Sequence, residues 1–333
     1  MKLVDLEKTL AKAATPFICG QEPSQKDFTV YQEIVKNNQL PMESTPLAYA
    51  WCEAVKKFDE ETMKSWPQVE EADAQITQKP AKVTEEFNVN EKHPIKEYDF
   101  DVDALWVYLR RIFDERIVVL DGGMGTQLQT YKLQEEDYRG TVEEFLKCPK
   151  EMKNNNDLLN VTQKGIVTEI HEAYLLAGAD IVETNTFNGT WISQADYGLE
   201  KYAYRMNYEA ARLARISADK VTAAEKGTPE GRWRLVAGAV GPTNRTASVS
   251  PKVEDASFRN VTYNELVDAY YEQIAGLVDG GAHIIFVETV FDTLNARAAV
   301  YAYNEYFKDT GLTPLPLFIS GTIIDAAGRT LSG

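Results

Sequence analysis

Apolar residues recur with a helical period through the first 68 residues of the chain. Two amphipathic faces consist of Leu3, Leu6, Leu10 and Ala14, and of Leu47, Ala50, Trp51, Ala54, Val55 and Phe58. Between them, Ser24 and Asp27 have the spacing of a capping box at the start of a further helix. The pattern therefore predicts a helical domain over residues 1–68.

The period changes after residue 105, where short runs rich in Val and Ile alternate with helical stretches. The five runs are RIVVLDGG, AGADIVETN, RLVAGAVGPTN, GGAHIIFVET and PLFISGTIID. They are apolar without alternation, as expected for parallel strands that helices cover on both sides. The second and fourth runs echo one another. Repeated units of this kind predict an α/β fold of the TIM-barrel type, whose functional residues follow the carboxyl ends of the strands.

Composition marks a boundary between the two regions. All 13 arginines lie at or after Arg110, and residues 69–104 are rich in Glu, Lys, Gln and Pro with few large apolar residues. That tract is typical of a linker. We therefore expect a helical domain at 1–68, a linker at 69–104 and a barrel domain at 105–333.

Charge and apolar content narrow the classes of function. The net charge of −16 argues against nucleic acid or an anionic membrane as the main partner, because both favour a basic face. No apolar run is long enough to span a membrane, and the N-terminus lacks the apolar core of a signal peptide. Cys19, Cys52 and Cys148 are too few and too far apart for a disulfide framework. These features predict a cytoplasmic protein.

Polar residues gather where the predicted strands end. The set comprises Asp121, Gly122 and Gly123; Glu183, Thr184, Asn185 and Thr186; Gly241, Thr243 and Asn244; Glu288 and Thr289; and Ser320, Gly321 and Thr322. Acids suit an ammonium group, while hydroxyls and the N–H groups of glycine suit a carboxylate. A single acid of this kind is as often a helix cap or half of an ion pair. Three acids at strand ends favour a pocket for a small zwitterion.

Seven motifs in order resemble one known family. They are VLDGGMGTQLQ, NNDLLNVTQ, AGADIVETNTFN, VAGAVGPTNRTASVSP, FRNVTYNELVDAYYEQ, FVETVFDTLNARAAV and ISGTIIDAAGRTLSG. Together they resemble the N-terminal homocysteine-binding module of cobalamin-dependent methionine synthase, from about residue 112 to the last residue. The resemblance implies a (β/α)8 barrel, a homocysteine substrate, a zinc ion that activates the thiol, and methylcobalamin as the methyl donor.

The resemblance also implies roles for particular residues. Asp121 and Glu288 would hold the homocysteine amino group, and the backbone of Gly122 and Gly123 would lie against the substrate. The remaining residues of the mouth would be Glu183, Asn185, Thr186 and Asn244.

The sequence departs from that family at the metal. The family holds zinc with three cysteines, and the printed sequence ends at Gly333 before the corresponding positions. Cys148 falls where the family has a cysteine that is not a ligand, and His93, His171 and His283 are expected to have structural roles. We therefore expect no metal ligand and no catalytic residue within these residues, about five of eight strands, and no cobalamin-binding module.

Residues 1–68 resemble the C-terminal helical domain of glutathione transferases. The order of helices and the segment AYAWCEAVKKF carry this resemblance. Such domains usually dock other proteins, so a protein partner is implied and glutathione chemistry is not. Two functions follow from the sequence: a homocysteine methyltransferase module, or an interaction protein in which the barrel is a remnant.

Overall fold

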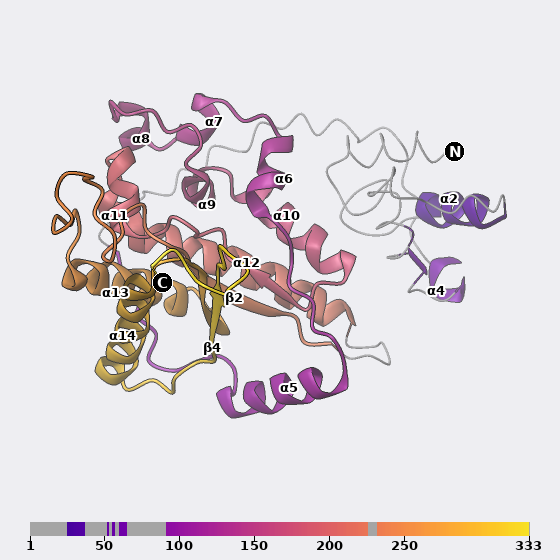
Figure 1. Ribbon diagram of the computed structural model, residues 1–333. Helices are drawn as coiled ribbons and strands as arrows, with labels where there is room; N and C mark the ends of the chain where they lie inside the picture. The colour runs from indigo at the N-terminus through magenta and orange to yellow at the C-terminus, as the bar shows by residue number, and fades with distance from the viewer. Residues whose placement is uncertain are drawn as a thin grey trace. The chain divides into compact units, whose positions relative to one another are not determined.

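The computed structural model describes residues 25–36, 52, 55–56, 60–64, 91–225 and 232–332 (Figure 1). The chain divides into two compact units, the first assigned residues 1–84 and 176–178 and the second residues 85–175 and 179–333. In the first unit, α2 (Gln25–Lys36) and α4 (Glu60–Lys64) contact one another. Phe28, Ile34 and Val55 are buried there.

The helix predicted after the capping box is confirmed by α2. Ser24 and all but one of the residues that form the two predicted amphipathic faces lie outside the described residues. Val55 is the exception, and it is helical and fully buried. The likeness of this unit to glutathione transferases therefore stays a prediction.

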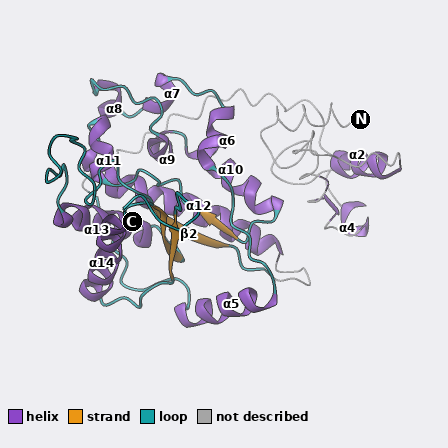
Figure 2. Cartoon of the chain, viewed as in Figure 1, coloured by secondary structure: helices purple, strands orange, loops and turns teal. Residues whose placement is uncertain are grey.

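The second unit is built on a parallel sheet. Its strands are β1 (Ile181–Glu183), β2 (Leu235–Val240), β3 (Ile284–Val290) and β4 (Leu317–Gly321), hydrogen-bonded in the order β1-β2-β3-β4 (Figure 2). All three pairings are parallel. Four of the five predicted strands are thereby confirmed, together with the α/β class. A closed barrel stays a prediction.

The first predicted strand adds only a short ladder to β1. Leu120 forms a single parallel bridge with Ile181. The N–H of Asp180 donates to the carbonyl of Val119 (2.8 Å), and the N–H of Asp121 donates to that of Ile181 (3.0 Å). Asp121 is thus held beside β1 although the residues before it form no full strand.

Long helices alternate with the strands along the chain. They are α10 (Lys164–Ala177), α12 (Ala203–Glu225), α13 (Tyr263–Asp279) and α14 (Thr293–Thr310). Shorter helices fill the connections: α6 (Met124–Thr130), α7 (Glu135–Arg139), α8 (Glu143–Lys147), α9 (Leu159–Thr162), α11 (Trp191–Gln194), and the 3-10 turns η2 (Asn156–Leu158), η3 (Ala195–Tyr197) and η4 (Glu200–Tyr202). None of the described helices is long and apolar enough to cross a membrane.

Helix α5 (Val102–Glu115) covers the amino-terminal ends of the strands, below the sheet in Figure 1. Asp101, which precedes the helix, caps its first turn: the Asp101 side chain accepts hydrogen bonds from the N–H groups of Asp103 and Ala104. The buried face of α5 packs on the strands in one apolar cluster, which contains Leu105, Leu109, Ile112, Ile181, Leu235 and Ile284.

Residues 91–101, which the sequence places in the linker, pack against the second unit. The Tyr98 hydroxyl donates to the carbonyl of Thr313 (2.9 Å), and the N–H of Ile95 donates to Asp279 (3.1 Å). Asp99 forms an ion pair with Arg215 (3.0 Å). These contacts are long-range in sequence, so no local periodicity indicates them.

Candidate functional site

Three acids meet at the carboxyl ends of the strands. Asp121 follows the short ladder, Glu183 is the last residue of β1, and Glu288 lies near the end of β3. The N–H of Glu183 donates to the carboxylate of Asp121 (3.1 Å). Glu288 lies close enough to Glu183 for their charges to interact. All three side chains are half-buried, so a ligand can still reach them.

Burial and mutual repulsion raise the pKa of each acid. Burial is the main cause for Asp121, whose pKa rises to about 7 although the N–H of Glu183 favours its ionised form. Burial, followed by the charges of Glu288 and Asp121, raises the pKa of Glu183 to about 8. Burial also raises the pKa of Glu288. The cluster therefore holds protons at a pH where ordinary carboxyl groups have lost them.

No ion pair with a described basic residue compensates the cluster. Within residues 91–225 and 232–332, none of the ion pairs involves Asp121, Glu183 or Glu288. Half-buried acids without a cationic partner are costly to a fold. This cost distinguishes them from structural acids such as Asp292, which caps α14 and accepts hydrogen bonds from Ser248 and Leu294.

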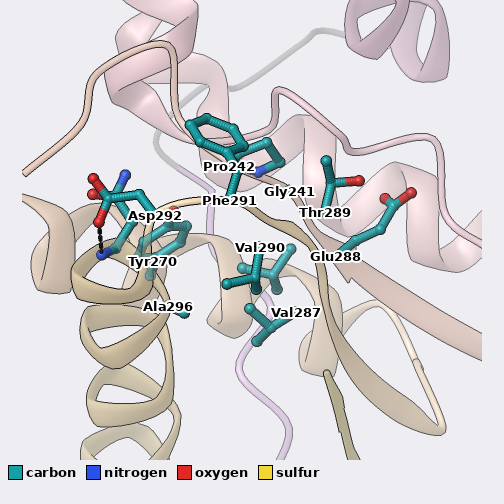
Figure 3. Close-up of a pocket in the computed structure, with 12 residues that line it drawn as sticks. Gly241, Pro242, Tyr270, Val287, Glu288, Thr289, Val290, Phe291, Asp292 and Ala296 are labelled. Carbon is teal, nitrogen blue, oxygen red and sulfur yellow. Dashed lines mark hydrogen bonds between the residues drawn. The ribbon is translucent and has the colours of Figure 1, made fainter. Parts of the chain in front are cut away.

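The backbone beside Glu288 is irregular. The register between β3 and β4 shifts between Val287 and Val290, and Thr289 has a φ of 55°, a conformation that costs a β-branched residue energy. The N–H of Thr289 donates to the Ser320 hydroxyl (3.3 Å). Figure 3 shows Glu288 and Thr289 together on one side of a pocket, with Asp292 on the other. The bulge thus sets the direction of Glu288.

The two glycines after Asp121 differ in what surrounds them. A Cβ added to Gly122 would lie 2.9 Å from the ring of Tyr174, so a larger residue there would displace that side chain. Gly123 precedes α6, and its carbonyl accepts from the Tyr174 hydroxyl (3.4 Å). Both glycines are exposed. The tyrosine gives Gly122 a packing reason that the sequence did not indicate.

Asn185 and Thr186 are buried beneath the site and already have partners. Asn185 donates to the carbonyl of Asn156 (2.7 Å), and its own carbonyl accepts from Asn160 (2.7 Å). The Thr186 hydroxyl donates to the carbonyl of Ala239 (2.6 Å) and is completely buried. These hydrogen bonds fix the loop after β1.

Asn244 is exposed, four residues after the end of β2. Its side-chain amide donates to the exposed Asp196 (2.7 Å). Of the eight residues predicted for the site, Asp121 and Glu183 are joined by a hydrogen bond, and Glu288 lies close enough to raise the pKa of both; Gly122 and Gly123 follow Asp121 in sequence. It gives Asn185, Thr186 and Asn244 other hydrogen-bond partners.

Comparison with known proteins assigns the second unit. The family model of homocysteine S-methyltransferase matches residues 118–333, more than half of the chain. The chain belongs to the homocysteine S-methyltransferase family. The match begins three residues before Asp121 and includes all three acids of the cluster.

Solved structures of one homocysteine methyltransferase are similar to this chain. The oxidized form of MmuM from Escherichia coli is 21% identical, with a TM-score of 0.49 over 68% of this chain and 68% of that chain. Its metallated form is also 21% identical, with a TM-score of 0.48 over 68% of this chain and 69% of that chain.

The described residues of this family member do not fit a metal site. Among them, no three histidine, cysteine, aspartate or glutamate side chains are placed to hold a metal ion. Cys148 is half-buried, with its sulfur 3.6 Å from the carbonyl of Tyr197. His171 and His283 are fully buried, and burial lowers the pKa of both. Both histidines are therefore neutral core residues at neutral pH.

Sequence reasoning missed the residues that support the site from other elements. Tyr174 on α10 contacts the glycines, while Asn156 and Asn160 hold the loop after β1. Asp157, buried beside them, accepts from the N–H of Asn188 (3.0 Å). Asn156, Asp157 and Asn160 all lie in the motif NNDLLN. The unusual concentration of Asn and Asp in this motif was the signal in the sequence that could have indicated them.

Proposed function

We propose that this chain binds homocysteine at the three strand-end acids and presents its thiol for methylation to methionine. The observation that carries the proposal is the cluster of Asp121, Glu183 and Glu288, which has no cation in the described part of the protein. An ammonium group supplies both the missing positive charge and three N–H donors. Membership of the homocysteine S-methyltransferase family names the substrate class.

The cluster favours an ammonium group over a metal ion. Metal ligands must converge on one point at about 2.0–2.6 Å, and no described group of acids does so. Ammonium is bound by hydrogen bonds of about 2.7–2.9 Å, a looser arrangement. In this proposal Asp121 and Glu288 hold the amino group, and the exposed backbone of Gly122 and Gly123 lies along the substrate.

Methyl transfer needs more than binding. The thiolate is the nucleophilic form of a thiol, and zinc supplies it in the family that the sequence resembles. Because the described residues do not fit a zinc site, we assign them binding and orientation alone. We further propose methylcobalamin as the methyl donor, as in methionine synthase, and a docking role for the N-terminal helices. These two proposals rest on sequence resemblance.

Calorimetry tests the binding site. Homocysteine should bind the full chain, and Asp121→Asn or Glu288→Gln should each weaken binding by about ten- to a hundredfold, because each removes one charge-assisted hydrogen bond. The matched control is Glu200→Gln, which changes an exposed acid of η4 and should leave the affinity unchanged.

A second ligand tests the chemistry of recognition. 4-Sulfanylbutanoic acid has the thiol and the carboxylate of homocysteine but lacks its amino group. It should bind at least tenfold more weakly than homocysteine to the unaltered chain, and equally weakly to the Glu288→Gln variant. Equal affinity for the two ligands would show that the acids do not recognise the ammonium group.

A further inference from the structure

The ladder between β1 and β2 continues past Glu183 through side chains instead of backbone. Its last backbone hydrogen bond runs from the N–H of Thr184 to the carbonyl of Ala237 (2.9 Å). In a regular parallel ladder the N–H of Ala239 would next donate to the carbonyl of Thr184. It donates to the Thr184 hydroxyl instead (2.9 Å). The carbonyl of Thr184 accepts from the N–H of Thr186 (2.9 Å), which turns the chain away from the sheet. The Thr184 hydroxyl thus takes the place of its own carbonyl.

The following position of the ladder shows the same exchange. A regular ladder would join the N–H of Thr186 to the carbonyl of Ala239, and the Thr186 hydroxyl makes this bond instead (2.6 Å). Each hydroxyl has one hydrogen, and that of Thr186 is used on Ala239. Thr184 therefore donates the 2.6 Å hydrogen bond between the two hydroxyls. Both threonines are buried, so the Thr184 hydroxyl accepts from β2 and donates to Thr186 without water.

Helix α13 and the end of β2 fix the path of the turn. The buried side-chain amide of Gln273 donates to the carbonyls of Thr186 (2.9 Å) and Ala239 (3.3 Å). Gly241 follows β2 and permits a close approach, since a Cβ there would lie 2.1 Å from the carbonyl oxygen of Phe187. The chain after β1 therefore passes the end of β2 along one defined path.

We infer that Thr184 is a positioning residue for Glu183 in the proposed homocysteine site. β1 ends at Glu183, whose N–H donates to the carboxylate of Asp121 (3.1 Å). The Thr184 hydroxyl lets the strand end at this acid and still provides the buried N–H of Ala239 with an acceptor. Without the hydroxyl, that N–H would have to regain the carbonyl of Thr184, because a buried unpaired N–H is costly. The peptide that follows Glu183 would then turn and displace the acid.

The inference rests on the function proposed above, and it gives a role to a residue that the family resemblance leaves without one. Two ligands separate positioning of the acid from general support of the fold. Thr184→Val removes the hydroxyl at nearly constant volume, and calorimetry on the full chain should show about tenfold weaker binding of homocysteine. 4-Sulfanylbutanoic acid has no amino group for the acids to hold, so its affinity should not change. Thr184→Ser keeps the hydroxyl and should bind both ligands as the unaltered chain does.

Thr190→Val is the matched control. Thr190 is buried in the same connection, and its hydroxyl accepts from the N–H of Ser193 (3.2 Å) at the first turn of α11. This variant loses a buried hydroxyl and some stability, but it should bind homocysteine with the unaltered affinity. Three outcomes would overturn the inference: unchanged homocysteine affinity in Thr184→Val, equal losses in the two valine variants, or equal losses for the two ligands.

A measurement without ligand keeps the inference separate from the proposed function. If the unaltered chain binds no homocysteine, the proposed function is wrong, and amide hydrogen exchange decides on Thr184. The reference is the N–H of Leu235, which is hydrogen-bonded at the opposite end of the ladder. Relative to it, the N–H of Glu183 that donates to Asp121 should exchange about tenfold faster in Thr184→Val. The ratio should not change in Thr190→Val.

An unchanged exchange ratio in Thr184→Val would overturn the inference whatever the ligand data. Should that variant not fold, Thr184→Cys takes its place, because a thiol is close in size to the hydroxyl and is a weak acceptor. It should change homocysteine affinity and the exchange ratio in the same directions by a smaller factor. No change in either would contradict the positioning role.

Discussion

At the amino-terminal ends of the strands, the buried carboxylate of Asp180 receives two hydrogen bonds from Arg116 (2.6 and 2.7 Å). At the carboxyl ends, Glu183 lies three residues later, forms no ion pair within residues 91–225 and 232–332, and is repelled by the charges of Glu288 and Asp121. The pKa values diverge accordingly. Burial pushes both upward, but Arg116 holds the pKa of Asp180 below its usual range, while that of Glu183 rises to about 8.

The same contrast extends to the surroundings of each end. Arg234, completely buried at the amino-terminal end, donates to the carboxylate of Glu225 (2.7 and 3.0 Å) and to the carbonyl of Ala179 (2.6 Å). Helix α5 seals that end with apolar side chains. Removing one partner of a buried charge pair costs a fold stability, so we expect substitutions at the paired end to destabilise the protein. The acids at the opposite end, which form no ion pair among the described residues, belong to the proposed ligand site. Four substitutions test this difference.

Arg234→Met should have the largest effect on stability. It leaves the carboxylate of Glu225 and the carbonyl of Ala179 without their donors, and breaking a buried pair in this way costs about 3–5 kcal/mol. Chemical denaturation of the second unit measures the loss. The matched control is Arg329→Met, whose ion pair with Asp325 is exposed and contributes at most about 1 kcal/mol. Equal losses for the two variants would contradict the paired-end interpretation.

Leu109→Ala should be nearly as damaging. Leu109 is buried between α5 and the strands, and removing such a side chain leaves a cavity that costs about 2–5 kcal/mol. Val107, on the exposed side of the same helix, provides the control, since Val107→Ala removes little buried area. A similar loss in both variants would show that α5 does not seal the sheet. Homocysteine affinity of the folded Leu109→Ala protein should be unchanged.

Tyr108→Phe should cost about 1–2 kcal/mol. The Tyr108 hydroxyl donates to the carbonyl of Trp233 (3.0 Å) and accepts from its N–H (3.0 Å), so both backbone groups lose a partner. Thermal unfolding of the variant measures the effect. The control is Tyr301→Phe, at a half-exposed site on α14, which should have the same unfolding midpoint as the unaltered protein. An unchanged midpoint for Tyr108→Phe would mean that water replaces the hydroxyl.

Glu183→Gln should differ from the other three substitutions in sign, because it should stabilise the fold. A carboxyl group whose pKa is raised in the folded state contributes stability below its unfolded pKa, near 4, and loses that contribution as the pH rises through about 8. Neutralising Glu183 should therefore raise the unfolding midpoint at pH 8 and leave it nearly unchanged at pH 5. A lower midpoint at both values would place Glu183 among the structural acids.

These two ends were unequally predictable from the sequence. The acids Asp121, Glu183 and Glu288 were predicted because parallel strands place their carboxyl ends at one edge, and Val- and Ile-rich runs reveal such strands. Each of the two echoes, AGADIVETN and GGAHIIFVET, contributes one glutamate to the predicted site, Glu183 and Glu288.

The amino-terminal end was not predictable in the same way. Asp180 occupies the position in the first echo that His283 occupies in the second, but the partner of Asp180 is Arg116, 64 residues away in sequence. His283 instead accepts from the N–H of Val236 (3.0 Å) and packs against Phe100. Such pairings depend on which distant segments meet, and local periodicity carries no information about that.

The same reasoning explains the weak first strand. RIVVLDGG has the composition of a buried strand, yet Ile117 and Val119 are exposed and only Leu120 forms a bridge. Composition records a preference for extended backbone, whereas a full strand also needs neighbours along its length. In the described residues this stretch has β1 as its neighbour on one side.

The contacts of α5 and residues 91–101 determine which fragment of this protein can be isolated in folded form. The family match starts at residue 118, but a fragment cut there would lose α5 and expose Leu235 and Ile284 to water. Such a fragment would aggregate through this freshly bared apolar patch. A fragment that begins near residue 91 would keep α5 and the hydrogen bonds that the N–H groups of His93 and Ile95 donate to Tyr204 and Asp279. The segment that matches the family therefore begins later in the chain than the segment needed for a stable fold.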